Sequence, residues 1–151
     1  MSFTALSKLF SFSKNSLPLN VSRSFSMTPV LSHICKLTRL RVVDNSNIGK
    51  QAMLEGKPPR CIHIYKKAKR YAIGTIGDKV LVAIKGQKKK AFIVGVKKEQ
   101  KHMVPKFDSN NIVLLDDHGN PLGTRVLVPI PSFLRGRGEF SKIIAISSRF
   151  V

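Results

Sequence analysis

The chain has 151 residues and carries 27 Lys and Arg against 8 Asp and Glu, which gives a formal net charge of +19. This length suits one domain with at most one extension, and a hydrophobic share of 42% excludes a chain that is disordered throughout. Two cysteines without a Cys-x-x-Cys pair do not describe a secreted disulfide scaffold, and no apolar run approaches the roughly 20 residues that span a bilayer. Because so much charge of one sign repels itself, a polyanionic partner is expected, either nucleic acid or an anionic membrane surface.

Residues 1–30 have the composition of a targeting segment. They hold eight serines, and residues 1–43 contain six basic residues and no acidic one. Apolar residues recur there at helical spacing, namely Phe3, Leu6, Leu9 and Phe10. A basic, Ser-rich, amphipathic leader is typical of a mitochondrial transit peptide, so we expect cleavage shortly after Arg23 and a mature protein in the mitochondrial matrix. The alternative is a basic arm that stays on the chain and contacts RNA.

Short runs rich in Val and Ile follow the leader and predict β-strands. They span residues 37–43, 61–65, 79–85, 91–96, 112–115 and 124–128. In the third run the even-numbered residues 80–84 share one face and Leu81 and Ala83 the other. Burial on both faces indicates a closed or covered sheet. Six short strands with helix only at the end of the chain therefore favour a mainly β fold, a small β-barrel formed as a single domain by residues 31–151.

Turn-forming residues separate these runs. Asp44-Asn45-Ser46 predicts an Asx turn, which could present Lys50 to a ligand or have no partner at all. Residues 117–120 predict a second turn. Near the C-terminus, Ser132 is expected to cap a short helical turn, and residues 140–146 fit a helix or a strand.

The positive charge of the expected mature chain is concentrated in its first half. Basic residues exceed acidic ones by 12 in residues 44–107 and by one in residues 108–151. Three bursts of cations, at residues 66–70, 88–90 and 97–106, adjoin the apolar runs, so we expect them at strand ends or in loops. There they could bind backbone phosphates, which give affinity but little base information; a solvated loop without a partner is the alternative for any single burst. The expected RNA-binding residues are Lys50, Arg60, Lys66, Lys67, Lys69, Arg70, Lys88, Lys89, Lys90, Lys97, Lys98, Lys101, Arg125 and Arg135.

Two other kinds of site have weak support in the sequence. His33, Cys35, Cys61 and His63 are zinc-ligand types, but their one-residue spacers fall outside the usual spacing of about two to four, so a buried Cys61 is the preferred interpretation. No phosphate-cradling Gly-Lys-Ser/Thr loop and no Gly-x-Ser-x-Gly elbow occurs. We therefore expect no enzyme, no metal and no cofactor.

Ordered fragments across the expected strands resemble one protein family. The fragments are LRVVDNS at residues 40–46, KAFIV at 90–94, FDSNNIVLL at 107–115 and PLGTRV at 121–126, with further matches at residues 60–64, 70–72, 77–78, 134–135 and 140–144. Together they resemble the fourteenth protein of the large ribosomal subunit, a universal family, over residues ~37–147. The Ser-rich leader is foreign to bacterial members and points to the mitochondrial form.

The resemblance implies a closed five-stranded β-barrel with a β-ribbon and short C-terminal helices. It further implies binding to large-subunit rRNA at the subunit interface, contributions to bridges with the small subunit, contacts with large-subunit proteins three and nineteen, and docking of a ribosomal silencing factor. The near-neutral C-terminal region is the expected protein-facing surface, with these residues: Ser132, Phe133, Leu134, Arg137, Phe140 and Lys142. An off-ribosome β-barrel translation factor that binds RNA is the alternative function.

The chain also departs from bacterial members of the resembled family. Residues 48–60 look longer, while the loop at residues 86–90 and the hairpin at residues 99–106 look shorter. We expect these departures to change individual RNA contacts and to leave the barrel as it is.

Overall fold

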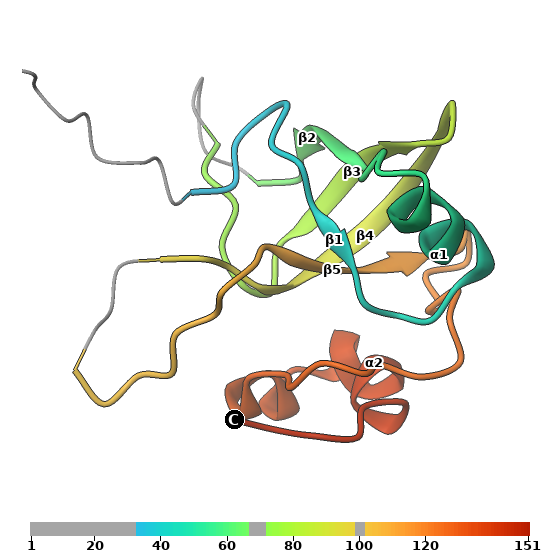
Figure 1. Ribbon diagram of the computed structural model, residues 1–151. Helices are drawn as coiled ribbons and strands as arrows, with labels where there is room; N and C mark the ends of the chain where they lie inside the picture. Colours follow the sequence, from blue (N-terminus) through green and yellow to red (C-terminus); the bar gives the residue numbers. More distant parts are fainter. Residues whose placement is uncertain (1–32, 67–71, 99–101) are drawn as a thin grey trace, which may run out of the picture. The chain divides into compact units, whose positions relative to one another are not determined.

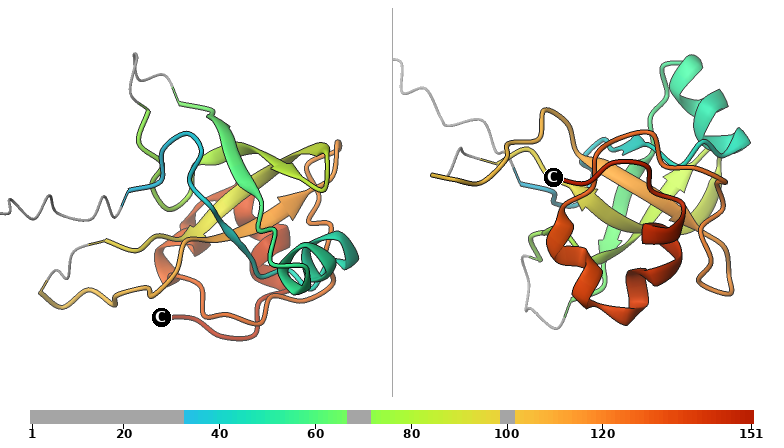
Figure 2. Two further views of the ribbon diagram at one scale, coloured as in Figure 1. Left: turned by 45° about the horizontal axis from the view of Figure 1, so that its top comes forward. Right: turned by 90° about the horizontal axis from the view of Figure 1, so that it is seen from below.

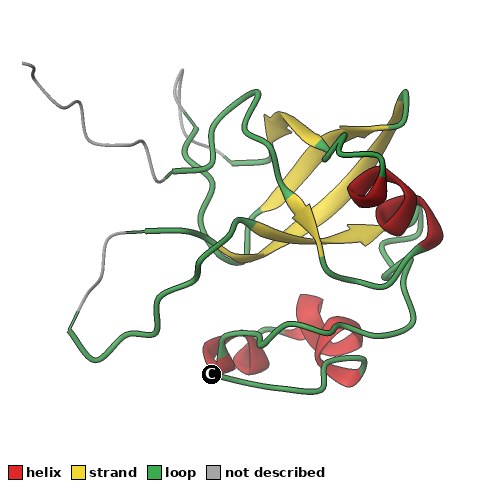
Figure 3. Cartoon of the chain, viewed as in Figure 1, coloured by secondary structure: helices red, strands yellow, loops and turns green. Residues whose placement is uncertain are grey.

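The computed structural model describes residues 33–66, 72–98 and 102–151, all of which belong to one compact unit, Leu31–Val151. Its elements in chain order are strand β1 (Arg41–Val42), helix α1 (Asn47–Leu54), strands β2 (Arg60–Ile64), β3 (Lys79–Ile84), β4 (Gln87–Gly95) and β5 (Asn111–Leu115), the 3-10 helices η1 (Ser132–Gly136) and η2 (Gly138–Phe140), and helix α2 (Ser141–Ala145). Figures 1 and 3 show the strands together and the last three helical elements along one side of the sheet.

The five strands form one sheet in the order β1-β5-β4-β3-β2. The β1–β5 pair is parallel and the other three pairs are antiparallel. Backbone hydrogen bonds join the chain just before β1 to β2: Leu37 N donates to Cys61 O at 2.8 Å, and Cys61 N donates to Thr38 O at 3.0 Å. The two ends of the sheet therefore meet, and the expected mainly β, barrel-like fold with C-terminal helices is confirmed. The expected β-ribbon includes residues 99–101, which lie outside the described residues.

The barrel interior is filled by the inward-facing residues of β2 to β5, together with residues of α1 and the neighbouring loops. Alternate positions on β3 are buried, as are their counterparts on the neighbouring strands, and Cys61 is fully buried among them as expected. The interior consists of Ile34, Leu40, Ala52, Cys61, Ile64, Val80, Val82, Ile84, Ala91, Ile93, Val96, Ile112 and Leu114. This period-two burial is what the apolar alternation of the strands demands.

A second core lies on the outer side of β4 and β5. The apolar residues Phe92 and Val94 on β4 and Val113 and Leu115 on β5 pack under residues 126–151, which we call the C-terminal layer. The right-hand view of Figure 2 shows this layer against the sheet. Burial on both faces, predicted for β3, is instead found at the end of β4 and along β5; Leu81 and Ala83 of β3 are only half-buried.

Asp44 joins the barrel to helix α1. It is fully buried, and its Oδ1 accepts hydrogen bonds from Ser46 N at 3.1 Å and Ser46 Oγ at 2.8 Å. Its Oδ2 accepts from Leu114 N on β5 at 3.0 Å. The predicted Asx turn is confirmed, and the carboxylate satisfies a backbone donor in the interior that would be costly to leave unpaired.

Helix α1 was not predicted. Ser46 has extended backbone and its Oγ accepts from Gly49 N at 3.3 Å, so it caps the helix N-terminus. A Cβ on Gly49 would lie 2.5 Å from Val42 Cγ1, so the absence of a side chain lets the helix pack against β1. The longer segment noted at residues 48–60 thus contains a helix and the turn that follows it, and the expectation of helix only at the chain end was wrong.

Three expectations for the C-terminal half also need correction or completion. Residues 124–128 do not form a strand: Val126 N donates to Ile146 O at 3.0 Å within the C-terminal layer, because β1 already occupies the free edge of β5. Ser132 is the first residue of η1 and makes no side-chain cap. Residues 140–146, left open between helix and strand, contain α2. The predicted turn at residues 117–120 is confirmed, with Gly119 at φ 79°.

Candidate nucleic-acid interface

Strand β4 changes character along its length. Its first four residues, Gln87-Lys88-Lys89-Lys90, are exposed or half-buried, and its last five are buried. Lys88 and Lys90 lie opposite Ala83 and Leu81 of β3, on the outer face of the sheet. The lysines were expected at a strand end or in a loop; they lie in the first part of the strand because the β3–β4 hairpin turns immediately before them.

Lys89 belongs to the opposite face from its two neighbours. It pairs with Val82, whose side chain lies in the barrel interior. Side chains on a strand alternate between faces, so the burst at residues 88–90 divides two to one. Lys89 is accordingly half-buried, whereas Lys88 and Lys90 are exposed.

The row of outer-face cations continues onto β2. Arg60 pairs with Ala83, and Ala83 pairs with Lys88 on its other side. Arg60, Lys88 and Lys90 are all exposed, and the side chains between them on β3 are the half-buried Leu81 and Ala83. We call Arg60, Lys88 and Lys90 the basic face.

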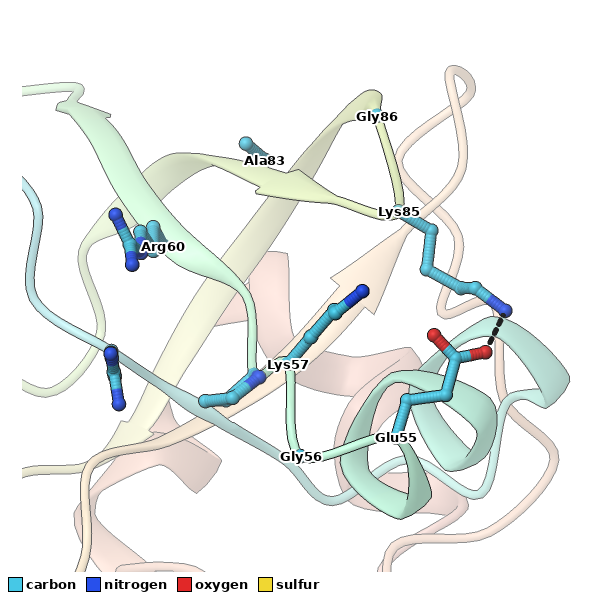
Figure 4. A pocket seen from close by; sticks show the side chains of 9 residues that line it. Glu55, Gly56, Lys57, Arg60, Ala83, Lys85 and Gly86 are labelled. Carbon is cyan, nitrogen blue, oxygen red and sulfur yellow. Dashed lines mark hydrogen bonds and ion pairs between the residues drawn. The ribbon is translucent and has the colours of Figure 1, made fainter.

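A pocket of about 570 Å³ adjoins the basic face where the turn after α1 meets the β3–β4 turn. Figure 4 shows the Lys57 side chain between Arg60 on one side and the joined Lys85 and Glu55 on the other. Four cations and one carboxylate line the pocket. The lining residues are Arg39, Glu55, Gly56, Lys57, Pro58, Arg60, Ala83, Lys85 and Gly86.

The one carboxylate of the pocket is engaged by one of its cations. Lys85 Nζ donates to Glu55 Oε1 at 2.7 Å and to Gln51 Oε1 at 3.1 Å, which ties the β3–β4 turn to helix α1. The hydrogen bond from Lys85 holds the pKa of the Glu55 carboxyl below its usual value, and the charges of Lys85 and Lys57 act in the same direction. Glu55 is therefore ionised at neutral pH.

The other predicted RNA-binding residues do not gather at one site. Lys66 is paired with Asp78 at 3.2 Å and also donates to Thr75 Oγ1. Arg135 stacks on the Phe150 ring at 3.9 Å within the C-terminal layer. Lys50, Lys97, Lys98 and Arg125 lie on other segments, namely α1, the chain after β4 and the chain after β5. Lys67, Lys69, Arg70 and Lys101 lie outside the described residues.

Sequence reasoning missed three cations of the pocket. Arg39 was placed inside an expected strand, and Lys57 and Lys85 are isolated in the sequence rather than part of a burst. Lys57 and Lys85 each adjoin a glycine with positive φ, Gly56 at 67° and Gly86 at 78°. A glycine beside a single lysine between two elements is the one local signal that could have marked them as turn cations.

The comparisons with known proteins identify the family of the chain. The model of the family described as ribosomal protein L14p/L23e matches residues 33–151. The chain belongs to this family. It is also 53% identical, over 130 residues, to the large ribosomal subunit protein uL14m of Danio rerio, with 85% of this chain and 89% of that protein covered. The family resemblance drawn from the ordered fragments is therefore confirmed.

In this L14p/L23e member the expected protein-facing residues divide by burial. Leu134 and Phe140 are buried in the second core, so they hold the C-terminal layer on the sheet and are not available to a partner. Ser132, Phe133, Arg137 and Lys142 are exposed, and Lys142 Nζ donates to Asn120 Oδ1. Leu134 and Phe140 were expected to face a partner. They face the sheet instead, because helical spacing turns one side of a short helix inward.

Cys61 has the properties of a core residue. Burial raises the pKa of its thiol to about 11, and the nearby Cys35 acts in the same direction. Since a metal binds the thiolate, this environment disfavours the zinc alternative. Within the described residues no three His, Cys, Asp or Glu side chains gather as a metal-binding group would require. None of the helices described is long and apolar enough to cross a membrane.

Proposed function

We propose that this chain is a structural constituent of the mitochondrial large ribosomal subunit and binds large-subunit rRNA through its basic face. Family membership, with a relative named as a large ribosomal subunit protein, supports the place in the subunit. The single observation that carries the RNA-binding surface is the placement of Arg60 on β2 and of Lys88 and Lys90 on β4, on either side of β3 and on a face that the C-terminal layer does not cover.

The remainder of the proposal concerns the neighbours of the subunit. The C-terminal layer would face protein: Phe133, 56% exposed, and Arg137 are available there. We assign to this side the contacts with large-subunit proteins three and nineteen, the bridges to the small subunit and the docking of a silencing factor. An exposed aromatic residue beside an Arg suits protein contacts better than phosphate contacts alone.

Residues 1–30 complete the proposal as a transit peptide that is removed from a mature domain of residues 31–151. Their basic, acid-free composition supports import into the matrix.

Gradient fractionation of a mitochondrial lysate tests the assignment. We expect the chain to sediment with the large subunit at one copy per subunit, to stay bound in moderate salt and to be released by ribonuclease. The N-terminal sequence of the sedimented band should begin shortly after Arg23 rather than at Met1. Sedimentation away from ribosomes, or a copy number far below one per subunit, would instead favour an off-ribosome factor.

A further inference from the structure

The pocket beside the basic face has an open backbone at two of its edges. Gly56 and Gly86 form its turns with left-handed backbone conformations, at φ 67° and 78°. A Cβ added at either glycine would meet no atom within 4 Å. The lining of the pocket also includes Ala83, whose side chain is a single methyl group. A ligand could therefore approach the backbone closely without first displacing a side chain.

The charge in this pocket is not balanced from within the protein. Glu55 is engaged by Lys85, and no ion pair among the described residues involves Arg39, Lys57 or Arg60. Three cations around one pocket repel each other, and an anion that binds between them removes this repulsion. Two of the three are Arg, whose planar fork of donors matches phosphate oxygens.

We propose that this pocket is a phosphate-binding site in which Arg39, Lys57 and Arg60 together hold one phosphate group. This inference rests on the proposed function, which makes a backbone phosphodiester of rRNA the occupant of the site in the ribosome. Lys85, tied to Glu55 and Gln51, forms the wall of the site and does not contribute a free charge.

The lining also determines what the site can recognise. A volume of about 570 Å³ lies within the range of roughly 300–1,000 Å³ common for small ligands, so a phosphate fits with its attached sugar. None of the lining residues has an aromatic ring on which a base could stack. A pocket that holds the phosphate group would therefore contact the RNA backbone, which carries little base information.

The neighbouring residues favour a polyanion over an isolated anion. Arg60 belongs both to the pocket and to the basic face, which continues through Ala83 to Lys88. A strand of RNA can occupy the pocket with one phosphate and follow the row of cations with the next ones. A single free phosphate would use only the pocket.

The decisive experiment measures how rRNA affinity depends on salt for the full chain. Each phosphate contact adds roughly 0.7–0.9 to the slope of log K against log[salt]. In a triple variant, Arg39→Gln, Lys57→Gln and Arg60→Gln, we expect the slope to fall by about one contact, because the three cations share one phosphate. The triple variant Lys36→Gln, Arg137→Gln and Arg149→Gln removes the same charge at exposed positions outside the pocket and outside the expected RNA-binding residues, and it serves as the control. A pocket variant with the wild-type slope overturns the inference, as does one whose slope and affinity fall no more than those of the control.

An NMR titration with inorganic phosphate distinguishes the possible sources of the phosphate. We expect the side-chain Nε–Hε signals of Arg39 and Arg60 to shift with phosphate, not with chloride at equal ionic strength, and to shift at lower phosphate in Glu55→Gln, which frees Lys85. Shifts with inorganic phosphate in a chain that fails to bind rRNA would keep the site but overturn the proposed function. Binding of polyglutamate without any response to phosphate would overturn the site in favour of an acidic protein partner.

Discussion

The outer side of the sheet has two regions, one covered by other residues and one exposed. Over the end of β4 and β5 it is apolar and covered by the C-terminal layer; over β2, β3 and the beginning of β4 it is cationic and uncovered. Lys79 lies at the boundary, with its Nζ 5.1 Å from the centre of the Phe92 ring and 3.6 Å from Glu139 Oε2 of the layer. One strand, β4, thus supplies a stability surface and a binding surface by changing its outward residues after Lys90.

The difference shows that two separate free-energy contributions act on the same face: the gain from burying apolar side chains and the cost of desolvating cations. Burial of apolar side chains holds the layer in place, and the Phe92 and Phe140 rings pack within it with centroids 4.6 Å apart. Among the described residues no such cover lies over the cationic region, because desolvating unpaired lysines would cost more free energy than burial of their methylenes returns. Substitutions in the two regions should therefore affect different measurements.

The largest expected effect is on stability, from Phe140→Ala. Phe140 is 2% exposed, and truncation of a buried Phe costs about 3–5 kcal/mol of the free energy of unfolding. Urea denaturation of the full chain measures this loss. Phe133→Ala, on the neighbouring exposed side of the layer, is the control and should change stability by less than about 0.5 kcal/mol. Equal effects of the two substitutions would mean that the layer is not held by its buried face.

A second effect, on RNA affinity rather than stability, is expected from Lys88→Gln with Lys90→Gln. These side chains lie on the outer face, so each that meets a phosphate should remove roughly 0.7–0.9 from the slope of log K against log[salt] with rRNA. The matched variant Lys89→Gln changes the inward-facing neighbour and should leave the slope closer to that of the wild type. If Lys89→Gln has the larger effect, the division of this burst between faces is wrong.

The smallest expected effect concerns Cys61 in the barrel interior, which belongs to neither region of the outer side. The folded chain should react with iodoacetamide at exposed Cys35 and not at buried Cys61, and mass spectrometry after proteolysis locates the label.

The Cys61 thiol should also affect stability at alkaline pH. Because burial raises the pKa of Cys61 from 9.0 to about 11, the contribution of the protonated thiol to the free energy of unfolding is complete below pH 9 and is lost as the pH rises through 11. Cys61→Ala should remove this part of the alkaline loss of stability, and an unchanged profile would contradict the assignment.

Local pattern was sufficient for much of the barrel. The apolar runs predicted β2 to β5 to within a few residues, because alternation and β-branched side chains favour strands wherever one face is buried. Asp44 formed the predicted Asx turn, since its carboxylate accepts a hydrogen bond from Ser46 N, and residues 117–120 formed the other predicted turn with backbone hydrogen bonds to Asp116. Helix α1 escaped prediction because its eight residues include an interior Gly49, which is tolerated only for its close packing on Val42.

The candidate site was less accessible to sequence reasoning. The burst at residues 88–90 was recognised as cationic, but a burst does not say which of its members share a face until the hairpin register is known. Arg39, Lys57 and Lys85 come from three segments and meet only because the chain before β1 pairs with β2 and the two turns lie side by side. Such proximity has no signature at any single position.

The sequence by itself determined the sign and concentration of the charge, the barrel-forming strands and the family, since each depends on residue type and order along the chain. The tertiary structure alone decided which cations stand together, which apolar residues hold the C-terminal layer, and that Leu134 and Phe140 face inward. The physical reason is that propensity and charge are local properties, whereas burial and mutual repulsion depend on distances that only the folded sheet sets.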